Sequence, residues 1–422
     1  MAQWPYFQEP VHETGTVAAS ARTTSTSGSS KEDIQKIDVV DKIFLLEPRK
    51  YPFIQLLTNV GRSYDGSVWK GSGMQKAPTQ TTEFHCYEDK FGGRYAKVNA
   101  DYNNSNDPVT ITVSGAGSSS GYIFTPGDVI LNARTGERMK VATVAGATSI
   151  TANRSVGTTP ATAGVIGDGL YIIGNTNEEN ATARNVNTTL KTKETNLTQI
   201  FRTSISVSNS QKATAQYGEA ELPYQRRKKG IEHLLDIERA FIFGEKNNGT
   251  GSNSMPERTT GGILELIEAG NSYVQDQGGV LTAPDLDTFL REGFTYGDST
   301  KLLLCGGPVL SAINEIARGQ IQTKSGDTSY GLKITTWESP HGSINIVRHP
   351  FLVQDFSGYA FLLDMQNFKY RYLSANGENR DTKLNLNIQA KGADGQVDEY
   401  LTECGLERTE ASSHALLKGV VA

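Results

Sequence analysis

The sequence has few cysteines, and the three it has stand far apart. Cys86, Cys305 and Cys404 form no pair at the spacing of a metal site. Cys305 follows the apolar run Leu302–Leu304, which is typical of a buried strand, where a thiol acts as a small core residue. We therefore expect no disulfide framework and favour a reducing compartment.

Long apolar runs and targeting signals are also missing. No stretch approaches the roughly 20 apolar residues that a transmembrane helix needs. The first ten residues, MAQWPYFQEP, lack the basic segment followed by an apolar one that marks a signal peptide. We therefore expect no contact with a membrane.

Positive charge is not in excess. The 422 residues include 41 Lys and Arg and 46 Asp and Glu, which gives a net charge of −5 at pH 7. Proteins that bind nucleic acid through its phosphates do so with a basic surface that displaces counterions. The acidic balance argues against nucleic-acid binding as the main activity.

Catalytic motifs are equally scarce. The nucleophile-elbow pattern GxSxG occurs at 117–121, but in a Gly/Ser loop between two expected strands instead of a strand-to-helix corner. Neither GxxxxGK[ST] nor GxGxxG at a strand–helix junction is present, and the six histidines never stand at HxxxH spacing. The acidic stretch 101–107 lacks the glycine and closing glutamate of a calcium loop. The sequence predicts no enzyme activity, no cofactor and no metal.

What the sequence does contain is one long amphipathic helix pattern. Between Pro223 and Glu245, apolar residues recur at three- and four-residue steps, as on a helix that faces a core. Pro223 suits a first turn, and Gly244 suits a helix end. At about 1.5 Å per residue the helix would be roughly 34 Å long. We expect a domain to be built around it.

Charged residues on this helix have two interpretations each. Glu238 falls inside the apolar stripe, where a carboxylate must be paired or shifted in pKa. It is either a rim residue that reaches water or the partner of an arginine in the same or a neighbouring subunit. Arg226 and Arg227 open a run of four basic residues, which is either a phosphate-binding patch or, more commonly, a solvated helix face.

Residues 101–185 have a different composition from the rest of the chain. Short strand-like runs recur there, separated by Gly, Pro and Asp turn signals. This pattern predicts a small antiparallel barrel or sandwich. Polar strings at 101–106 and 175–185 flank it and indicate an insertion into another domain.

The N-terminal part of the chain is mostly extended or unstructured in pattern. Residues 13–31 are nearly all small and polar, which predicts a flexible arm or strap. Aromatic residues precede it, either as an anchor on a tether or as incidental members of a tail. Residues 62–99 are half-polar and resemble one long hairpin. The aromatic residues in question are Trp4, Tyr6 and Phe7, with Trp69 in the hairpin.

The order of these parts, together with three motifs, resembles the major capsid proteins of tailed bacteriophages, in the branch of the SU-ten-like phages. The motifs are EHLLDIERAFIFGEK (232–246), ERTTGGILELI (257–267) and DEYLTECGLE (398–407), and the resemblance extends from about residue 32 to 420. It implies the α+β fold of tailed-phage and herpesvirus major capsid proteins, the Hong-Kong-97-type or Johnson fold. That fold has a long spine helix, an extended loop and an N-terminal arm, here with an inserted small β-barrel or sandwich domain.

The resemblance also implies a division of the chain and a set of subunit-interface residues. The N-terminus is too short for a complete fused scaffolding domain, so a separate scaffolding protein or none is implied. The interface candidates are Trp4, Tyr6, Phe7, Trp69, Arg226, Arg227 and Glu238. The implied parts are the N-terminal arm (1–50), the two sides of the extended loop (51–100 and 186–212), the inserted β domain (101–185), the peripheral domain with the spine helix (213–262) and its returning strands (346–422), and the axial domain (263–345).

The function implied is that of a major capsid protein. Copies of the chain would assemble in the host cytoplasm into pentamers and hexamers of an icosahedral shell, part of a virion that encloses phage double-stranded DNA without sequence-specific binding. A shell subunit needs self-complementary edges instead of an active site, because contacts between unlike surfaces close into rings when the rotation permits. Separate scaffolding, portal and decoration proteins remain open as partners. Two alternatives also remain open: an encapsulin-type compartment shell, and a soluble carbohydrate-binding or hydrolytic protein with a β binding module.

Overall fold

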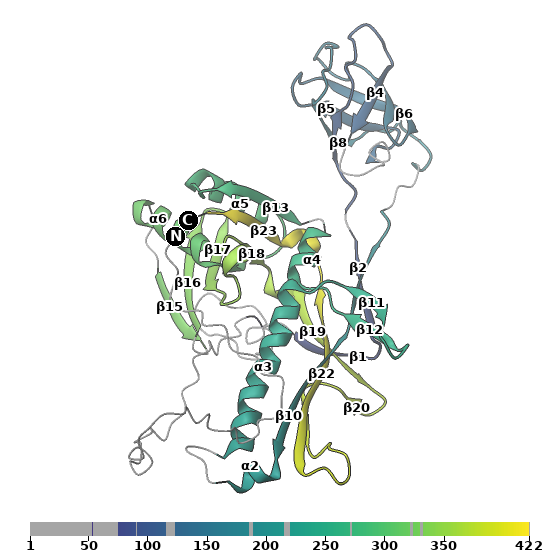
Figure 1. Cartoon of the computed structure of the whole chain (residues 1–422). Coiled ribbons are helices and arrows are strands. Elements are labelled where there is room, and N and C mark those ends of the chain that lie inside the picture. Colours follow the sequence, from purple (N-terminus) through teal and green to yellow (C-terminus); the bar gives the residue numbers. More distant parts are fainter. Residues whose placement is uncertain are drawn as a thin grey trace. The chain divides into compact units, whose positions relative to one another are not determined.

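The chain forms two units, each with a core of its own. The computed structural model describes residues 53, 75–89, 91–114, 123–184, 189–214, 220–270, 272–320, 324–329 and 332–421. One unit is Tyr87–Lys193, called here the barrel unit, and the other is the remainder of the chain, called the body (Figure 1). The chain passes between them through β2 (Glu83–Glu88) and β9 (Thr192–Leu197), which pair as a two-stranded sheet.

The barrel unit is a closed six-stranded barrel, which confirms the expected small β domain. Its strands alternate between buried and exposed residues, as the period of two in a half-buried strand requires. Ile111, Ile130 and Ile150 point inward and are completely buried. The strands, in barrel order, are β3 (Tyr95–Val98), β4 (Val109–Ser114), β7 (Ser149–Asn153), β6 (Arg138–Gly146), β5 (Asp128–Asn132) and β8 (Gly169–Asn175).

The barrel begins earlier in the chain than the sequence suggested. Strand β3 was expected in the extended loop, but it pairs with both β4 and β8 and so closes the barrel. A run of four residues is too short for its alternation to distinguish a barrel strand from one side of a hairpin.

The body is organised along the long helix α3 (Glu221–Phe243), two residues earlier at each end than the pattern between Pro223 and Glu245. Gly244 is the C-terminal cap of the helix, and close packing requires a glycine there: a Cβ would lie 2.3 Å from the Ala240 carbonyl oxygen and 2.6 Å from that of Thr260. The neighbouring backbone therefore leaves no room for a side chain at this position.

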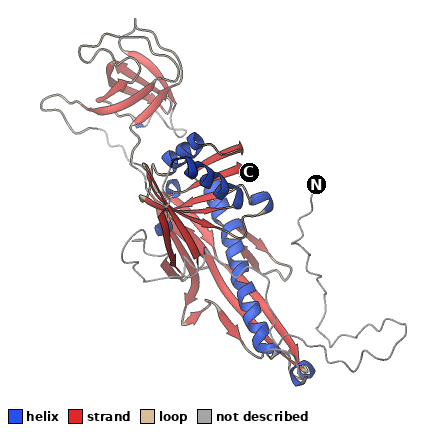
Figure 2. Ribbon diagram, turned by 90° about the vertical axis from the view of Figure 1, so that its left-hand side faces the viewer, coloured by secondary structure: helices blue, strands red, loops and turns tan. Residues whose placement is uncertain are grey.

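A six-stranded sheet lies along α3 (Figure 2). Its longest strand, β22 (Gly395–Arg408), pairs with β10 (Gln199–Ser208) over ten residues, from Gln199 opposite Cys404 to Ser208 opposite Gly395. The short helix α2 (Asn209–Ala213) follows β10 in the chain. The other strands are β1 (Gln75–Thr79), β19 (Phe368–Ala375), β20 (Glu378–Asn379) and β21 (Lys383–Asn385).

A seven-stranded mixed sheet completes the body. Its central strand β14 (Thr300–Cys305) contains the run expected to be a buried strand, and residues 301–305 are indeed buried. The helices of this part are α4 (Ile263–Glu268), α5 (Ala283–Gly293) and α6 (Gly307–Gln320). The strand order is β13 (Tyr273–Gly279), β23 (Ala415–Val420), β18 (Ala360–Leu363), β14, β17 (Gly342–Arg348), β16 (Leu332–Ser339) and β15 (Lys324–Ser329). The hairpin β11 (Asn247–Thr250) and β12 (Pro256–Thr259) stands apart.

The main core of the body joins the helix to both sheets. Phe241 of α3, Leu304 of β14 and Phe368 of β19 belong to one buried apolar cluster. Phe53 belongs to it as well, and its ring meets that of Phe368 edge-on at 6.0 Å between centroids. Segments that are far apart in the chain, from Phe53 to Leu416, therefore share one core.

Candidate functional site

The GxSxG pattern at 117–121 lies outside the residues that the structure describes. Within the ranges given above, no three His, Cys, Asp or Glu side chains gather as a metal site would require. None of the helices described is long and apolar enough to cross a membrane.

Four of the seven interface candidates, Trp4, Tyr6, Phe7 and Trp69, lie outside the described residues. Arg227 is exposed on α3, with its guanidinium 5.9 Å from the centroid of the Tyr224 ring.

Arg226 has a partner within the body. Its Nη2 lies 2.6 Å from Oδ2 of Asp398, and its Nε donates to the same oxygen at 2.8 Å. Asp398 is completely buried, so the arginine neutralises a carboxylate of β22. This contact ties the first half of α3 to the sheet.

Glu238 is completely buried, so its interpretation as a rim residue that reaches water is wrong. Its Oε1 accepts a hydrogen bond from the Phe53 N–H at 2.8 Å and lies 2.8 Å from Nε2 of His349. Nδ1 of His349 accepts from the Phe351 N–H at 3.2 Å, so Nε2 carries the proton that is donated to Glu238. Glu238 thus contacts Phe53 and His349 of its own chain, and its place at a subunit interface stays a prediction.

The three motifs of the resemblance meet at one place, called here the motif junction. It consists of the end of α3, the segment 257–262 and the C-terminal part of β22. The Gly262 N–H donates to the Gly244 carbonyl at 2.8 Å, and the Leu406 N–H donates to Oγ1 of Thr260 at 3.3 Å. A Cβ on Gly262 would lie 2.8 Å from the Ala240 carbonyl oxygen, so two backbones touch directly.

One side chain that the sequence did not indicate, Asn196, holds the motif junction together. Its Nδ2 donates to the carbonyls of Gly261 at 2.9 Å and Leu406 at 2.7 Å, and its Oδ1 accepts from the N–H groups of Gly261 and Leu197, both at 2.8 Å. Both donors and both acceptor positions of the amide are thus used. No motif marks this residue, because a buried amide between distant backbones leaves no local pattern.

Carboxylates of the motif DEYLTECGLE are paired with basic residues along β22. Burial opposes the ionisation of Asp398, but hydrogen bonds from the Asn387 N–H, Gln396 and Arg226 hold its pKa below the usual value. Charge-paired carboxylates of this kind hold a long strand against its neighbours. The ion pairs are Arg226–Asp398, Arg202–Glu399 (2.8 Å), Arg380–Glu403 (2.5 Å) and Arg371–Glu407.

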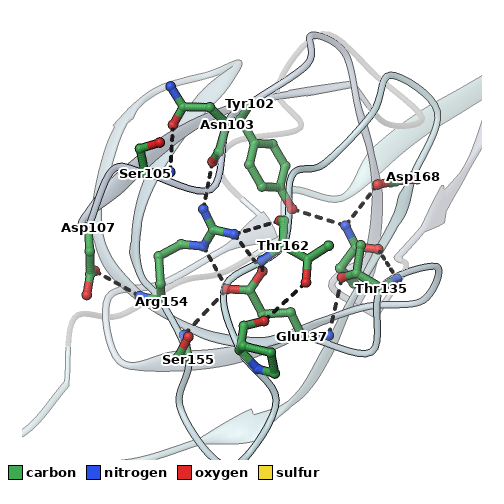
Figure 3. A network of polar contacts seen from close by, with 12 residues as sticks. Tyr102, Asn103, Ser105, Asp107, Thr135, Glu137, Arg154, Ser155, Thr162 and Asp168 are labelled. Atoms are coloured by element: carbon green, nitrogen blue, oxygen red, sulfur yellow. Dashed lines mark hydrogen bonds and ion pairs between the residues drawn. The ribbon is translucent and has the colours of Figure 1, made fainter.

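The barrel unit has its own buried polar network (Figure 3). Arg154 and Glu137 are both fully buried and form a bidentate ion pair, with Nε–Oε1 at 2.6 Å and Nη2–Oε2 at 2.7 Å. Arg154 also donates to the carbonyls of Asn103 and Thr162, and the carboxylate accepts from the N–H groups of Thr162 and Ser155. Burial opposes the ionisation of Glu137, but these bonds hold its pKa below the usual value.

A second carboxylate, that of Asp168, forms hydrogen bonds at the same end of the barrel (Figure 3). Arg134 donates to both of its oxygens, at 2.6 and 2.9 Å, and Asn132 donates at 3.0 Å. The hydrogen bonds from Arg134, then those from Asn132 and the Val165 N–H, lower the pKa of Asp168 to about 2 against the cost of burial. Both networks fasten loops onto a small barrel, and all their charged members are paired.

Comparison with known proteins gives one family and several distant structures. The sequence model of a family described as SU10 major capsid protein matches residues 18–421. The major capsid protein of Pseudomonas phage PaMx41 is 25% identical over 324 residues, which cover 70% of this chain and 76% of that protein. The capsid of Myoviridae phage XM1 aligns at 11% identity and a TM-score of 0.44, over 94% of this chain and 100% of that one. The SrpI encapsulin of Synechococcus elongatus PCC 7942 aligns at 15% identity and a TM-score of 0.40, over 55% and 76%.

Proposed function

This chain belongs to the SU10 major capsid protein family, and we propose that its copies assemble as pentamers and hexamers into an icosahedral shell around phage double-stranded DNA. The observation that carries the proposal is the extent of the family match, which runs over residues 18–421 and so includes both the body and the barrel unit. The chain is a capsid protein, and we propose that its role is structural and not catalytic.

The ion pairs and hydrogen bonds that join α3 to the six-stranded sheet support this proposal. The motif junction and the paired carboxylates of β22 bind α3 and the six-stranded sheet into one long element. A stiff element of this kind transmits load between neighbours in a shell. In the proposed particle, residues 213–262 and 346–422 form the peripheral domain, and residues 263–345 form the axial domain at the centres of pentamers and hexamers.

Partners follow from the same role. Copies of the chain are the main partners, and packaged DNA is contacted without sequence specificity, consistent with the net charge of −5. Separate scaffolding, portal and decoration proteins complete the particle, which is assembled in the host cytoplasm and becomes part of the virion.

Electron microscopy of the expressed full-length chain tests the proposal. We expect closed shells with five-fold and six-fold capsomers, and in particles purified from infected cells we expect nuclease-protected double-stranded DNA. A shell that holds an enzyme instead of DNA would favour the encapsulin-type alternative. A chain that stays monomeric or forms a small oligomer at every concentration, with or without a scaffolding protein, would contradict the proposal.

A further inference from the structure

The outer surface of the barrel unit carries an exposed aromatic pair. Tyr95 of β3 and Tyr171 of β8 stand directly opposite each other in the antiparallel register, and their ring centroids are 4.7 Å apart. Both remain open to solvent, at 39% and 45% exposure. Ile173, two residues further along β8, is 51% exposed. Outward positions of a barrel strand in water are normally polar, so these three exposed apolar side chains on two neighbouring strands require an explanation.

The apolar surface continues onto the next strand. Leu131 of β5 is the register partner of Tyr171 on the other side of β8 and points outward between buried neighbours. Gly169 of β8 supplies room for the rings, because a Cβ there would lie 3.0 Å from Cε2 of Tyr95 and 3.2 Å from Cε2 of Tyr171. We call Tyr95, Leu131, Tyr171 and Ile173 the tyrosine face.

Basic residues border the tyrosine face. Arg94 and Lys97 are exposed beside Tyr95, and Arg138 of β6 is exposed opposite Leu131 in the register. The ion pairs found in the described part of the barrel unit use other arginines, namely Arg134, Arg154 and Arg184. The border is therefore positively charged and selects an acidic partner surface.

The charge of the chain is divided unequally between the units. Residues 87–193 contain ten Lys and Arg and nine Asp and Glu, whereas the rest of the chain contains 31 and 37. Two tyrosine faces brought together would oppose their basic borders. A tyrosine face on the acidic body of another copy would pair unlike charges instead.

We propose that the tyrosine face is an intersubunit contact that docks on an acidic surface of the body of a second copy of this chain. The proposal rests on the proposed function, in which many copies surround each barrel unit. Tyrosine and arginine are among the residue types enriched at the centres of protein–protein interfaces, where they combine a large contact area with polar groups. In a shell this contact repeats on every subunit, so a modest affinity at each contact adds up over the particle.

The test uses the full-length chain and a double variant, Tyr95→Ser with Tyr171→Ser. The matched control is Val165→Ser with Ile166→Ser, which removes two apolar side chains that are also exposed on the barrel unit. We expect particles of the tyrosine variant to dissociate at a lower denaturant concentration than wild-type and control particles. Hydrogen exchange in β4 to β7 should be the same in all three, because the substituted side chains lie outside the barrel core.

Charge reversal adds a second readout. Arg94→Glu with Lys97→Glu should weaken the particles at low salt, and the difference from wild type should shrink as salt rises. A cryo-EM map of the wild-type particle should place carboxylates of a neighbouring body against the tyrosine face.

Three results would overturn the proposal. Wild-type particles in which the tyrosine face is open to solvent or covered by a different protein would overturn it and leave the proposed function intact. Binding of a free oligosaccharide that is lost in the tyrosine variant would assign the face to sugar recognition instead. A wild-type chain that forms neither particles nor oligomers would overturn both proposals.

Discussion

The two units bury charge in different ways. In the barrel unit, the buried partners Glu137 and Arg154 are 17 positions apart, because Glu137 directly precedes β6 and Arg154 directly follows β7 of the same hairpin. In the body, Glu238 is bonded to Phe53 and His349, which lie 185 and 111 residues away. The network around Glu137 and Arg154 therefore joins residues at most 51 positions apart, whereas the contacts of Glu238 in the body span 111 and 185 positions.

The partners also differ in kind. The barrel unit neutralises Arg154 with a carboxylate, but the body surrounds Lys301 with backbone: its Nζ donates to the carbonyls of Gly293, Tyr296 and Ser413 at 2.6 to 2.7 Å. Burial, opposed by the charges of Asp364, Asp298 and Glu410, lowers the pKa of Lys301 to about 8. Lys301 thus ties Ser413, which lies 112 residues away in the chain, to the nearby end of α5 and the loop that follows it.

This difference bears on how the units fold. Local contacts lose less chain entropy when they form, so structures rich in them fold faster than structures built from distant segments. We expect the barrel unit to unfold as a separate cooperative unit, and each substitution below to affect the unit that contains it and spare the other.

The largest effect is expected for Arg154→Met. Removing one member of a buried ion pair leaves the Glu137 carboxylate uncompensated, which costs about 3–5 kcal/mol. Hydrogen exchange monitored in β4 to β7 should show that loss of stability, while exchange in α3 and β22 stays unchanged. The control Arg138→Met, at an exposed position of the same barrel, should change little. An equal loss of protection in both units would mean that they unfold together and would contradict the comparison.

A smaller effect, confined to the body, is expected for Glu238→Ala. The Phe53 N–H and the His349 Nε2–H lose a buried acceptor, and a buried donor left without a partner costs about 1–3 kcal/mol. The measurement is the free energy of unfolding of the body, with exchange of the Phe53 amide as the local readout. Glu232→Ala, on the same helix but partly exposed, is the control. A variant that folds with wild-type stability and fails only in assembly would instead support a subunit-interface role for Glu238.

Local patterns in the sequence predict the long helix and the barrel, whereas contacts between distant segments could not be predicted. The long helix was predicted to within two residues at each end because its apolar period repeats over six turns. The barrel was predicted because its strands recur with turn signals between them. Both signals are local, and each can be read from one stretch of chain.

Contacts between distant segments left no such signal. The helix pattern showed that Glu238 needed a partner, but not that His349 supplies it. Asn196 was missed because a single amide carries no period and no motif, although it makes four hydrogen bonds at the motif junction. The paired carboxylates of β22 were recognised only as a family motif, since their arginine partners come from four separate segments.

The smallest effect is expected for acidification of the barrel unit through Asp168. Its pKa is lowered from 3.8 to about 2 in the folded state, so between those values the unfolded chain binds more protons and stability falls as the pH falls. The contribution of Asp168 is complete above about pH 4 and is lost towards pH 2. Asp168→Asn removes it, so the difference in barrel stability between wild type and this variant should shrink over that range. Arg134 is half-exposed, so added salt should reduce the difference further. A difference that stays constant from pH 5 to pH 2 would show that Asp168 holds the loops of the barrel by shape and hydrogen bonds and not by its charge.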